Sequence, residues 1–194
     1  MHMEKQKKII LGLCGPMASG KTTVTNYCKE TYGAVSFRFS DMLRDVLARI
    51  DIDSSRENMQ ALSTFLRGQY GEDLMSNVIA KDVANETAPF IIVEGVRRPT
   101  DVTYLRDVEG FHLVAITAEA KTRFDRITAR TENPDDQTKT WATFQKEQEQ
   151  EAEQEIGTIM ATAEMTIDNN GTVEELFAQV DMIVDDIRKD VPTA

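Results

Sequence analysis

Residues 12–23 read GLCGPMASGKTT, and they follow directly on the apolar run IIL at residues 9–11. The stretch contains the spacing Gly-x4-Gly-Lys-Thr, which begins at Gly15 and ends at Thr22. An apolar strand before this motif and a helical pattern after it are the context that a phosphate-binding P-loop requires. The sequence therefore predicts that the chain binds a nucleoside triphosphate.

Each residue type in the motif has a physical reason. Gly15 and Gly20 can adopt backbone conformations that a Cβ disfavours, so the chain can wrap a phosphate with its N–H groups inward. The following helix adds unpaired N–H groups and the positive end of its dipole. Lys21 can reach the β and γ phosphate oxygens as a catalytic cation, and the Thr22 hydroxyl can ligate Mg²⁺. The predicted nucleotide-binding residues of the loop are Gly15, Ala18, Ser19, Gly20, Lys21, Thr22 and Thr23.

Composition and charge narrow the class of protein. A chain of 194 residues with 41% hydrophobic residues can form a single domain over residues 1–194. The net charge of −11 argues against nucleic acid as the main partner, because phosphate backbones recruit basic surfaces. The sequence has neither an apolar run of membrane-spanning length nor a secretory leader, so we expect a cytoplasmic protein without a membrane partner.

Cysteine and histidine are sparse. Cys14 and Cys28 have no metal-ligand spacing, and reduced, buried thiols are the simplest expectation. His112 lies in an apolar stretch that is typical of a strand. The sequence therefore argues against zinc chemistry and against histidine catalysis.

Apolar stretches typical of strands alternate with helical patterns along the chain. Strands are expected at about residues 8–13, 34–39, 90–93, 111–116 and 165–168. Helices are expected at about residues 20–32, after a cap at Ser40, at 57–69, 72–86, 100–108 and 121–130, up to 163, and at 173–187. This order predicts an α/β fold of three layers, α/β/α, around a five-stranded parallel sheet.

Two segments are expected to form mobile subdomains over this core. The first is a helical insertion at about residues 42–88, and the second is a polar patch with flanking helix at about 126–150. The run at 147–155 is strongly acidic. A solvated helix face is the default interpretation of this run, and a role in closing the site is the alternative.

Residues 92–99 read IVEGVRRP and extend the predicted third strand into a polar turn. Glu94 is expected at the strand's carboxyl end beside the P-loop, where open α/β sheets collect ligands. A carboxylate there could hold Mg²⁺ through water or take a proton, so Glu94 is a candidate catalytic and metal-binding residue. Arg97 then projects over the same crevice; a surface arginine without function remains the alternative.

Two further segments carry charges toward the same crevice. Asp41 follows the second strand in the first turn of a helix, where a carboxylate also favours the helix dipole, and Arg44 lies one turn later. Arg123, Arg126 and Arg130 occupy the helix before the polar patch, the last two on one face at i, i+4. A flexible segment carrying arginines can close over a triphosphate and neutralise the transferring charge.

These segments resemble the nucleotide kinases among the P-loop phosphotransferases. Residues 39–44, FSDMLR, resemble the segment in adenylate kinases whose arginine holds the acceptor monophosphate. Residues 94–97, EGVR, resemble their Asp-Gly-x-x-Arg segment, although the arginine comes one residue earlier and Glu94 replaces the more common aspartate. Residues 126–130, RITAR, resemble the opening of their lid, where one arginine lies against adenine and the other meets phosphates. The resemblance implies a fold of the P-loop kinase type with an acceptor-binding insertion and a lid.

A match over nearly the whole chain is to an archaeal family of uncharacterised kinases described as dephospho-CoA-kinase-like or nucleotide-kinase-like. The matching segments include residues 12–22, 66–71, 93–97, 122–126, 133–144 and 167–171. This resemblance implies that Arg67 and Tyr70 belong to the acceptor pocket, and that the loop containing Asn169 borders the adenine.

The acceptor chemistry decides which residues matter. A phosphate acceptor is already an anionic nucleophile and needs positive charge but no general base. A hydroxyl acceptor must lose a proton to a nearby carboxylate. Arg44, Arg67 and Arg97 favour a phosphate-bearing acceptor, whereas Asp41 and Glu94 keep a hydroxyl acceptor open.

We therefore expect a kinase that uses ATP and Mg²⁺ to transfer the γ-phosphate to a nucleotide-type acceptor, foremost a nucleoside monophosphate. Three alternatives stay open: transfer to a ribose hydroxyl of the dephospho-CoA kinase type, a P-loop ATPase that switches a partner protein, and a kinase of unphosphorylated small molecules. These residues leave open the acceptor's base and whether the protein is a monomer or a homodimer.

Overall fold

A parallel sheet organises the part of the chain that the computed structural model describes, residues 8–129, 136–148 and 151–189. Its strands are β1 (Ile9–Cys14), β2 (Val35–Arg38), β3 (Phe90–Val96), β4 (Phe111–Thr117) and β5 (Met165–Asp168). The strand order is β2-β3-β1-β4-β5, and every neighbouring pair is parallel. The chain crosses from one side of β1 to the other between β3 and β4. The carboxyl end of β1 is therefore the switch point at which open α/β sheets bind ligands.

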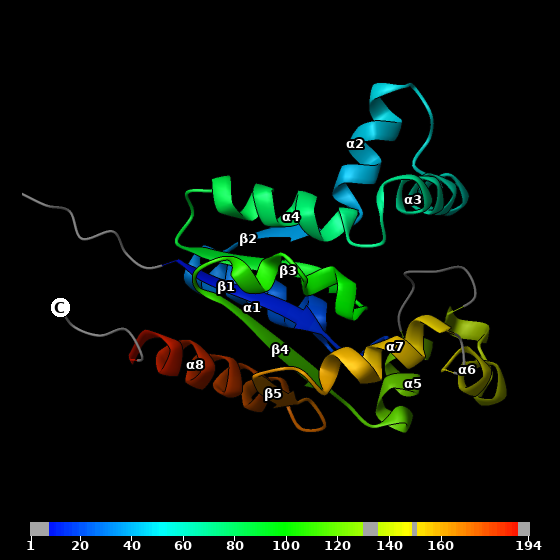
Figure 1. Cartoon of the computed structure of the whole chain (residues 1–194). Helices are drawn as coiled ribbons and strands as arrows, with labels where there is room; N and C mark the ends of the chain where they lie inside the picture. Colours follow the sequence, from blue (N-terminus) through cyan, green and yellow to red (C-terminus); the bar gives the residue numbers. More distant parts are fainter. Residues whose placement is uncertain (1–7, 130–135, 149–150, 190–194) are drawn as a thin grey trace, which may run out of the picture.

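Helices cover both faces of the sheet (Figure 1). Helices α1 (Lys21–Tyr32) and α8 (Val173–Lys189) pack on one face, and α4 (Leu74–Asn85) and α7 (Glu151–Met160) pack on the other. The remaining helical segments are α2 (Asp41–Arg49), α3 (Arg56–Tyr70), α5 (Ala120–Ala129), α6 (Trp141–Gln148) and the short 3-10 turns η1 (Pro99–Val102), η2 (Leu105–Asp107) and η3 (Asp136–Thr138). The predicted three-layer α/β/α fold with a five-stranded parallel sheet is confirmed.

The central strand β1 shows how the sequence produces two cores. Ile9, Leu11 and Leu13 belong to the core on the side of α1 and α8, whereas Ile10 and Cys14 belong to the core on the side of α4 and α7. Successive side chains of a strand point to opposite faces. Because helices cover both faces, the strand is apolar on both sides and all of its residues are buried.

Strand β3 is longer than the sequence indicates. It continues through Glu94 and Gly95 to Val96, because the strands on both sides still offer backbone partners there. Arg38 of β2 pairs with Glu94, and Cys14 of β1 pairs with Val96 after a shift of register. The strand predicted at about 90–93 is therefore three residues longer than expected, and Glu94 lies within the strand and not at its end.

Three local expectations also differ from the structure. The chain forms η1 and η2 instead of one helix at 100–108, and the segment up to 163 is divided into α6 and α7. Ser40 precedes α2, but its side chain makes no capping bond. Its Oγ accepts a hydrogen bond from Arg44 Nη1 (2.7 Å), while the Asp41 carboxylate accepts one from the Arg38 backbone N–H (2.8 Å).

The helical excursion predicted at 42–88 consists of α2, α3 and α4, of which α2 and α3 project away from the sheet (Figure 1). None of the α3 side chains, all of which the structure describes, is buried. The lid predicted at 126–150 includes residues 130–135 and 149–150, which lie outside the described residues. Within the described ranges, no helix is long and apolar enough to cross a membrane.

Both cysteines are free and fully buried. Burial raises the pKa of the Cys14 thiol to about 11 and the pKa of the Cys28 thiol to about 12, because the thiolate loses its hydration. Cys14 also donates a hydrogen bond from Sγ to the Val114 carbonyl oxygen (3.6 Å). The expectation of buried thiols without a disulfide is confirmed.

We predict that neither thiol reacts with Ellman's reagent at pH 8 in the folded protein. With a raised pKa, only about a thousandth of Cys14 is thiolate at that pH, and packing blocks access. In urea both pKa values return to about 8.5 and two thiols per chain react. Rapid reaction of either thiol in buffer alone would contradict the burial described above.

Candidate active site

The loop between β1 and α1 wraps tightly, with positive φ at Gly15 (146°), Ala18 (60°) and Gly20 (108°). A Cβ on Gly15 would lie 2.3 Å from the Ile116 carbonyl oxygen, and a Cβ on Gly20 would lie 2.1 Å from Asn169 Nδ2. The close approach of β4 and of the loop after β5 therefore requires both glycines. The left-handed conformation at Ala18 costs about 1 kcal/mol, so contacts around the loop must hold it in place.

Five consecutive carbonyl groups of this loop, those of residues 15–19, accept hydrogen bonds from side chains. In that order the donors are Lys21 for the first two, then Arg123, Arg126 and Asn169, at 2.6, 2.8, 3.3, 3.5 and 2.7 Å. Four of the five bonds come from cationic groups. The negative ends of these peptide groups are thus turned toward cations and an amide, and the arrangement favours an anion at the positive ends.

Arg123, Arg126 and Asn169, which bind the loop carbonyls and are called the clamp below, make further hydrogen bonds that fix their positions. Arg126 Nη2 donates to the Asn169 backbone carbonyl oxygen (2.9 Å), and Arg123 Nε donates to the Ala118 carbonyl oxygen (3.1 Å). Arg126 and Asn169, which the sequence assigns to the nucleotide, contact the P-loop backbone in this structure. Sequence reasoning assigned no separate role to Arg123, which is 7% exposed. Its position three residues before Arg126 on α5 was the available signal.

A second, independent observation supports a triphosphate as the ligand of this loop. The hydroxyl of Ser19 is buried and has no hydrogen-bond partner among the described residues. A polar group in that state loses its hydration without compensation, so a ligand oxygen would satisfy it. Thr22, in contrast, is exposed in the first turn of α1.

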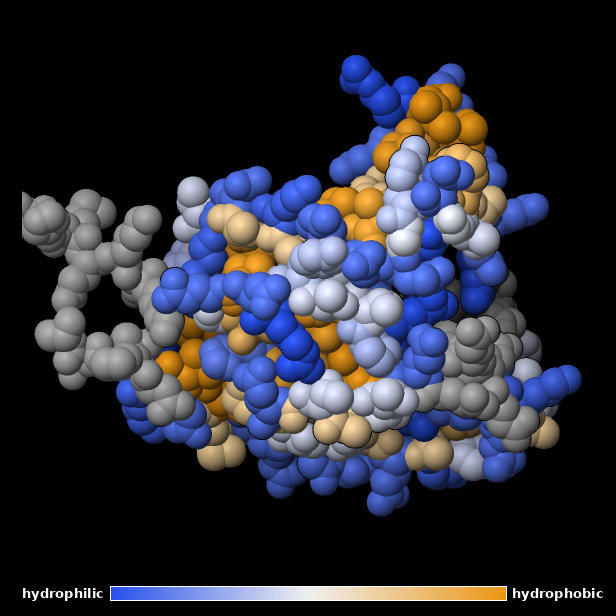
Figure 2. Space-filling model, in the orientation of Figure 1, coloured by the Kyte–Doolittle hydropathy of each residue, from blue (hydrophilic) through white to orange (hydrophobic). Residues whose placement is uncertain are grey.

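A cavity of about 750 Å³ opens beside the loop. Its walls come from the start of α1, the end of β2, the insertion helices α2 to α4, and the segment from β3 to η1. The lining residues are Lys21, Thr22, Arg38, Phe39, Ser40, Leu43, Gln60, Ser63, Thr64, Arg67, Gly68, Glu72, Met75, Glu94, Gly95, Arg97, Arg98 and Asp101. Figure 2 shows the α2–α3 lobe standing above hydrophilic residues on this side of the molecule.

The cavity wall is locally basic although the chain carries a net charge of −11. It contains the five basic residues Lys21, Arg38, Arg67, Arg97 and Arg98 against the three acidic residues Glu72, Glu94 and Asp101. An excess of positive charge in a concave site raises the local concentration of anions. The sequence analysis assigned no role to Arg38, which lies in a strand, or to Arg98, which directly follows the EGVR segment at 94–97.

Glu94 lines the cavity together with Thr22. Its Oε2 lies 3.2 Å from Arg38 Nε, whereas its Oε1 is buried without a hydrogen-bond partner in the described chain. A hydroxyl and a carboxylate are oxygen ligands of the kind that Mg²⁺ prefers. The described residues contain no group of three or more metal-ligating side chains. Thr22 and Glu94 therefore fit Mg²⁺ only together with phosphate oxygens.

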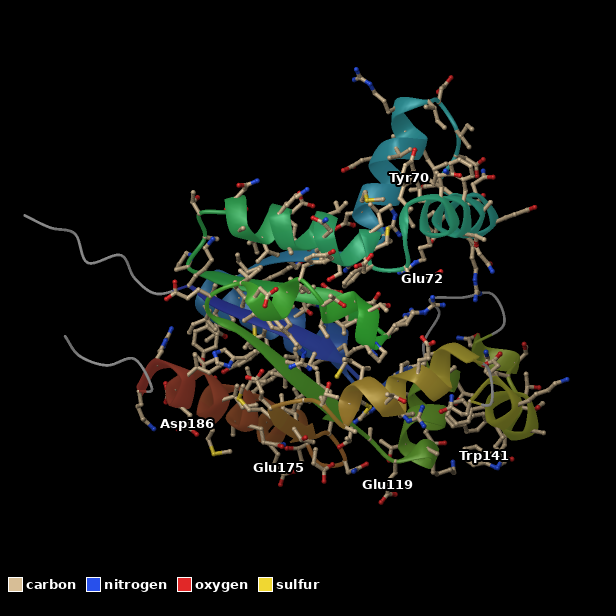
Figure 3. The ribbon with its side chains drawn as sticks, in the orientation of Figure 1. Tyr70, Glu72, Glu119, Trp141, Glu175 and Asp186 are labelled. Atoms are coloured by element: carbon tan, nitrogen blue, oxygen red, sulfur yellow. The ribbon has the colours of Figure 1, made fainter. Side chains whose placement is uncertain are left out.

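The other predicted acceptor residues divide into two groups. Arg67 and Arg97 line the cavity, whereas Asp41, Arg44 and Tyr70 do not. Asp41 Oδ1 lies 3.5 Å from Arg44 Nη1, and both side chains are about half exposed. Tyr70 is 64% exposed at the end of α3 (Figure 3). Arg130, the predicted lid arginine, lies outside the described residues.

The acidic run at 147–155 reaches the cavity at one described position. Glu155 Oε2 lies 3.1 Å from Arg98 Nε, and about a third of each side chain is exposed. At the start of the run, Glu147 Oε1 lies 2.7 Å from Lys139 Nζ. The described ends of this segment are therefore ion-paired, and one of them contacts the cavity wall.

Known proteins share this architecture. A shikimate kinase from Bacteroides thetaiotaomicron superposes with a TM-score of 0.62 at 13% identity, covering 93% of this chain and 98% of that chain. The chain thus shares its fold with this shikimate kinase. A family model described as AAA domain matches residues 11–157, so the chain belongs to the AAA domain family.

Sequence relatives cover almost the whole chain. A UPF0200 protein from Methanococcus maripaludis is 26% identical over 183 residues, which are 93% of this chain and 98% of the relative. A UPF0200 protein from Thermococcus kodakarensis is 27% identical over 184 residues, which are 92% of this chain and 98% of the relative. The predicted resemblance to an archaeal family is confirmed.

We predict that Asn169→Ala weakens nucleotide binding about tenfold and destabilises the fold by about 1–3 kcal/mol, because the buried Ser19 carbonyl loses its partner. Fluorescence titration with a methylanthraniloyl-ADP and urea unfolding measure the two effects. Asn26→Ala, an exposed amide on α1, is the matched control and should change neither. Wild-type affinity in Asn169→Ala would show that the clamp does not shape the loop.

Proposed function

We propose that this protein is an ATP-dependent phosphotransferase that moves the γ-phosphate of ATP to a nucleotide-type acceptor, foremost a nucleoside monophosphate. One observation carries the proposal: Lys21 and Thr22 of the P-loop lie in the wall of the same cavity as Arg67, Arg97 and Arg98. A site that only bound ATP would need the first group alone.

The size of the cavity agrees with a second small molecule. Sites for ligands of this kind typically enclose about 300–1,000 Å³, and this cavity measures about 750 Å³. Phe39, Leu43 and Met75 supply apolar surface, while Gln60 and Thr64 of α3 supply hydrogen-bonding groups. Such a mixture suits a base or sugar whose phosphate lies among the arginines.

The proposed chemistry is mainly electrostatic. Two anions repel each other as they approach, and cations fixed on separate segments offset that repulsion and hold the reacting groups in line. Lys21, which binds the Gly15 and Pro16 carbonyls in this structure, would exchange them for phosphate oxygens. Mg²⁺ held by Thr22, Glu94 and phosphate oxygens would supply charge neutralisation. The arginines would orient the acceptor and exclude water.

A hydroxyl acceptor is the second candidate, and Glu94 favours it. Glu94 lines a cavity that also contains cations, and its Oε1 is buried without a hydrogen-bond partner in the described chain. A carboxylate in that setting could accept the proton of a ribose hydroxyl, as in transfer of the dephospho-CoA kinase type. An ATPase switch needs only water as acceptor, so an arginine-lined cavity of this volume gives it no support. We further propose a cytoplasmic location, because free thiols suit a reducing compartment. A monomer or a homodimer both remain compatible with this proposal.

Release of ADP with different acceptors tests this function. Purified protein would be given MgATP with each nucleoside monophosphate, with dephospho-CoA, or with no acceptor. Stimulation by monophosphates supports the first candidate, and stimulation by dephospho-CoA alone supports the second. Equal release in every case, including the sample without acceptor, would exclude both in favour of the ATPase.

We predict that Lys21→Ala lowers the transfer rate by at least about 10²-fold and leaves the fold intact, because one fixed cation near developing charge is worth several kcal/mol. Acceptor-dependent ADP release and the thermal midpoint would be measured together. Lys29→Ala removes an exposed lysine of the same helix and should behave as wild type. Turnover retained in Lys21→Ala would contradict the assigned role.

We predict that Arg97→Ala raises the KM for the acceptor about tenfold while the affinity for MgATP stays within about twofold. The Arg97 guanidinium has no hydrogen-bond or ion-pair partner in the described chain, so its removal should leave the fold undisturbed. Arg49→Ala, on the exposed side of α2, is the control. A loss confined to ATP binding would place Arg97 in the other half of the site.

A further inference from the structure

Asp101 is the one acidic residue of the cavity wall that is almost fully buried, at 4% exposure. It lies in η1, directly after the turn that follows β3. A buried carboxylate is costly unless hydrogen bonds and a cation compensate for its lost hydration. Its placement in a site for anions calls for an explanation, because it repels the ligand that the arginines attract.

One oxygen of this carboxylate fixes the turn that carries two arginines. Asp101 Oδ2 accepts hydrogen bonds from the backbone N–H groups of Arg97 (2.9 Å) and Arg98 (3.0 Å). Both side chains line the cavity. The direction in which they leave the backbone is therefore set by Asp101.

The other oxygen reaches the opposite wall. Asp101 Oδ1 lies 3.4 Å from Nη2 of Arg67, which belongs to α3. The Arg67 side chain is only 14% exposed, and its Nη1 donates to the Glu72 backbone carbonyl oxygen. None of the α3 side chains is buried, so α3 has little apolar packing to hold it against the sheet and the helices that cover it. Figure 3 shows Glu72 on the segment that leads from α3 back to the body.

We propose that Asp101 is a positioning residue of the acceptor site. Its two oxygens tie the α3 wall to the β3–η1 wall and set the separation between Arg67 and the pair Arg97 and Arg98. Its negative charge also offsets the mutual repulsion of these guanidinium groups before an anion arrives. This inference rests on the proposed function only for the identity of the ligand, because the tie between the walls exists without catalysis.

The substitution Asp101→Asn separates the two halves of the tie. An amide has one accepting oxygen and one donating nitrogen. If the oxygen keeps the two backbone N–H groups, the NH₂ group faces the Arg67 guanidinium, donor against donor. The variant therefore keeps the η1 turn and removes the buried contact with Arg67, which leaves only the exposed Glu72 carboxylate, 3.6 Å from Arg67 Nη1 and 3.7 Å from Arg98 Nη1, to link the two walls. Asp107→Asn, an exposed aspartate in η2, is the matched control.

Hydrogen–deuterium exchange of the whole chain tests the tie without any acceptor. We expect Asp101→Asn to increase exchange of the α3 amides at residues 56–70 by about tenfold, with the amides of β1 and β4 unchanged. Asp107→Asn should match wild type. Unchanged exchange in α3 would overturn the proposal, whatever the protein's activity.

Kinetics then tests the consequence for the acceptor. With the acceptor that best stimulates ADP release, Asp101→Asn should raise the acceptor KM about tenfold and leave the dissociation constant for MgATP within about twofold. A parallel loss of both affinities would indicate general damage and overturn the positioning role. Should no acceptor stimulate release, the proposed function fails while the exchange result still decides the tie.

A second variant covers the case in which Asp101→Asn does not fold. Arg67→Lys keeps the positive charge of α3 but cannot reproduce the planar fork that spans Asp101 and the Glu72 carbonyl. It should increase α3 exchange in the same way, since it breaks the tie from the other side. Wild-type exchange in Arg67→Lys would contradict the proposal.

Discussion

The site depends on one constraint, the wrapped backbone of residues 15–19. The positive φ of Gly15 and Gly20 is open to glycine, but the left-handed conformation of Ala18 is costly without external support. That support comes from side chains that bind the loop's carbonyl groups: Lys21 from within, and Arg123, Arg126 and Asn169 from outside. Because α5 and the loop after β5 supply the outer donors, distant parts of the chain must fold correctly before the loop can receive an anion.

The cavity beside the P-loop is held by interactions of a different kind. Two of its arginines are held by partly exposed ion pairs, Arg38 with Glu94 and Arg98 with Glu155, rather than by a wrapped backbone. Partly exposed pairs of this kind are each worth about 0–1 kcal/mol. They can therefore be exchanged for contacts with a more highly charged ligand. The P-loop is thus preorganised, whereas in the cavity the proposed Asp101 tie sets the separation of the walls and only the partly exposed arginine pairs can exchange partners as the cavity fills.

The sequence predicted the fold well because its signals are local. The P-loop spacing placed β1 and α1, and apolar strands alternating with helices specified the parallel sheet. The continuation of β3 to Val96 could not be predicted, since it depends on partners in β1 and β2 that lie far away in the chain.

The site was predicted only in part, for the same reason. Lys21, Thr22, Arg67, Glu94 and Arg97 do converge on one cavity. Asp101 carried no sequence signal, because its importance comes from Arg67, which lies 34 residues earlier in the chain. The contacts of Arg126 and Asn169 with the loop backbone likewise depend on how α5 and β5 meet β1.

The most direct test of the account is the fate of labelled phosphate. Protein incubated with [γ-³²P]ATP, Mg²⁺ and a mixture of nucleoside monophosphates and dephospho-CoA would be analysed by thin-layer chromatography. If the protein is a nucleotide kinase, the label appears in a nucleotide product and little appears as inorganic phosphate. Label found only in inorganic phosphate, at the same rate with and without acceptors, would contradict the proposed function.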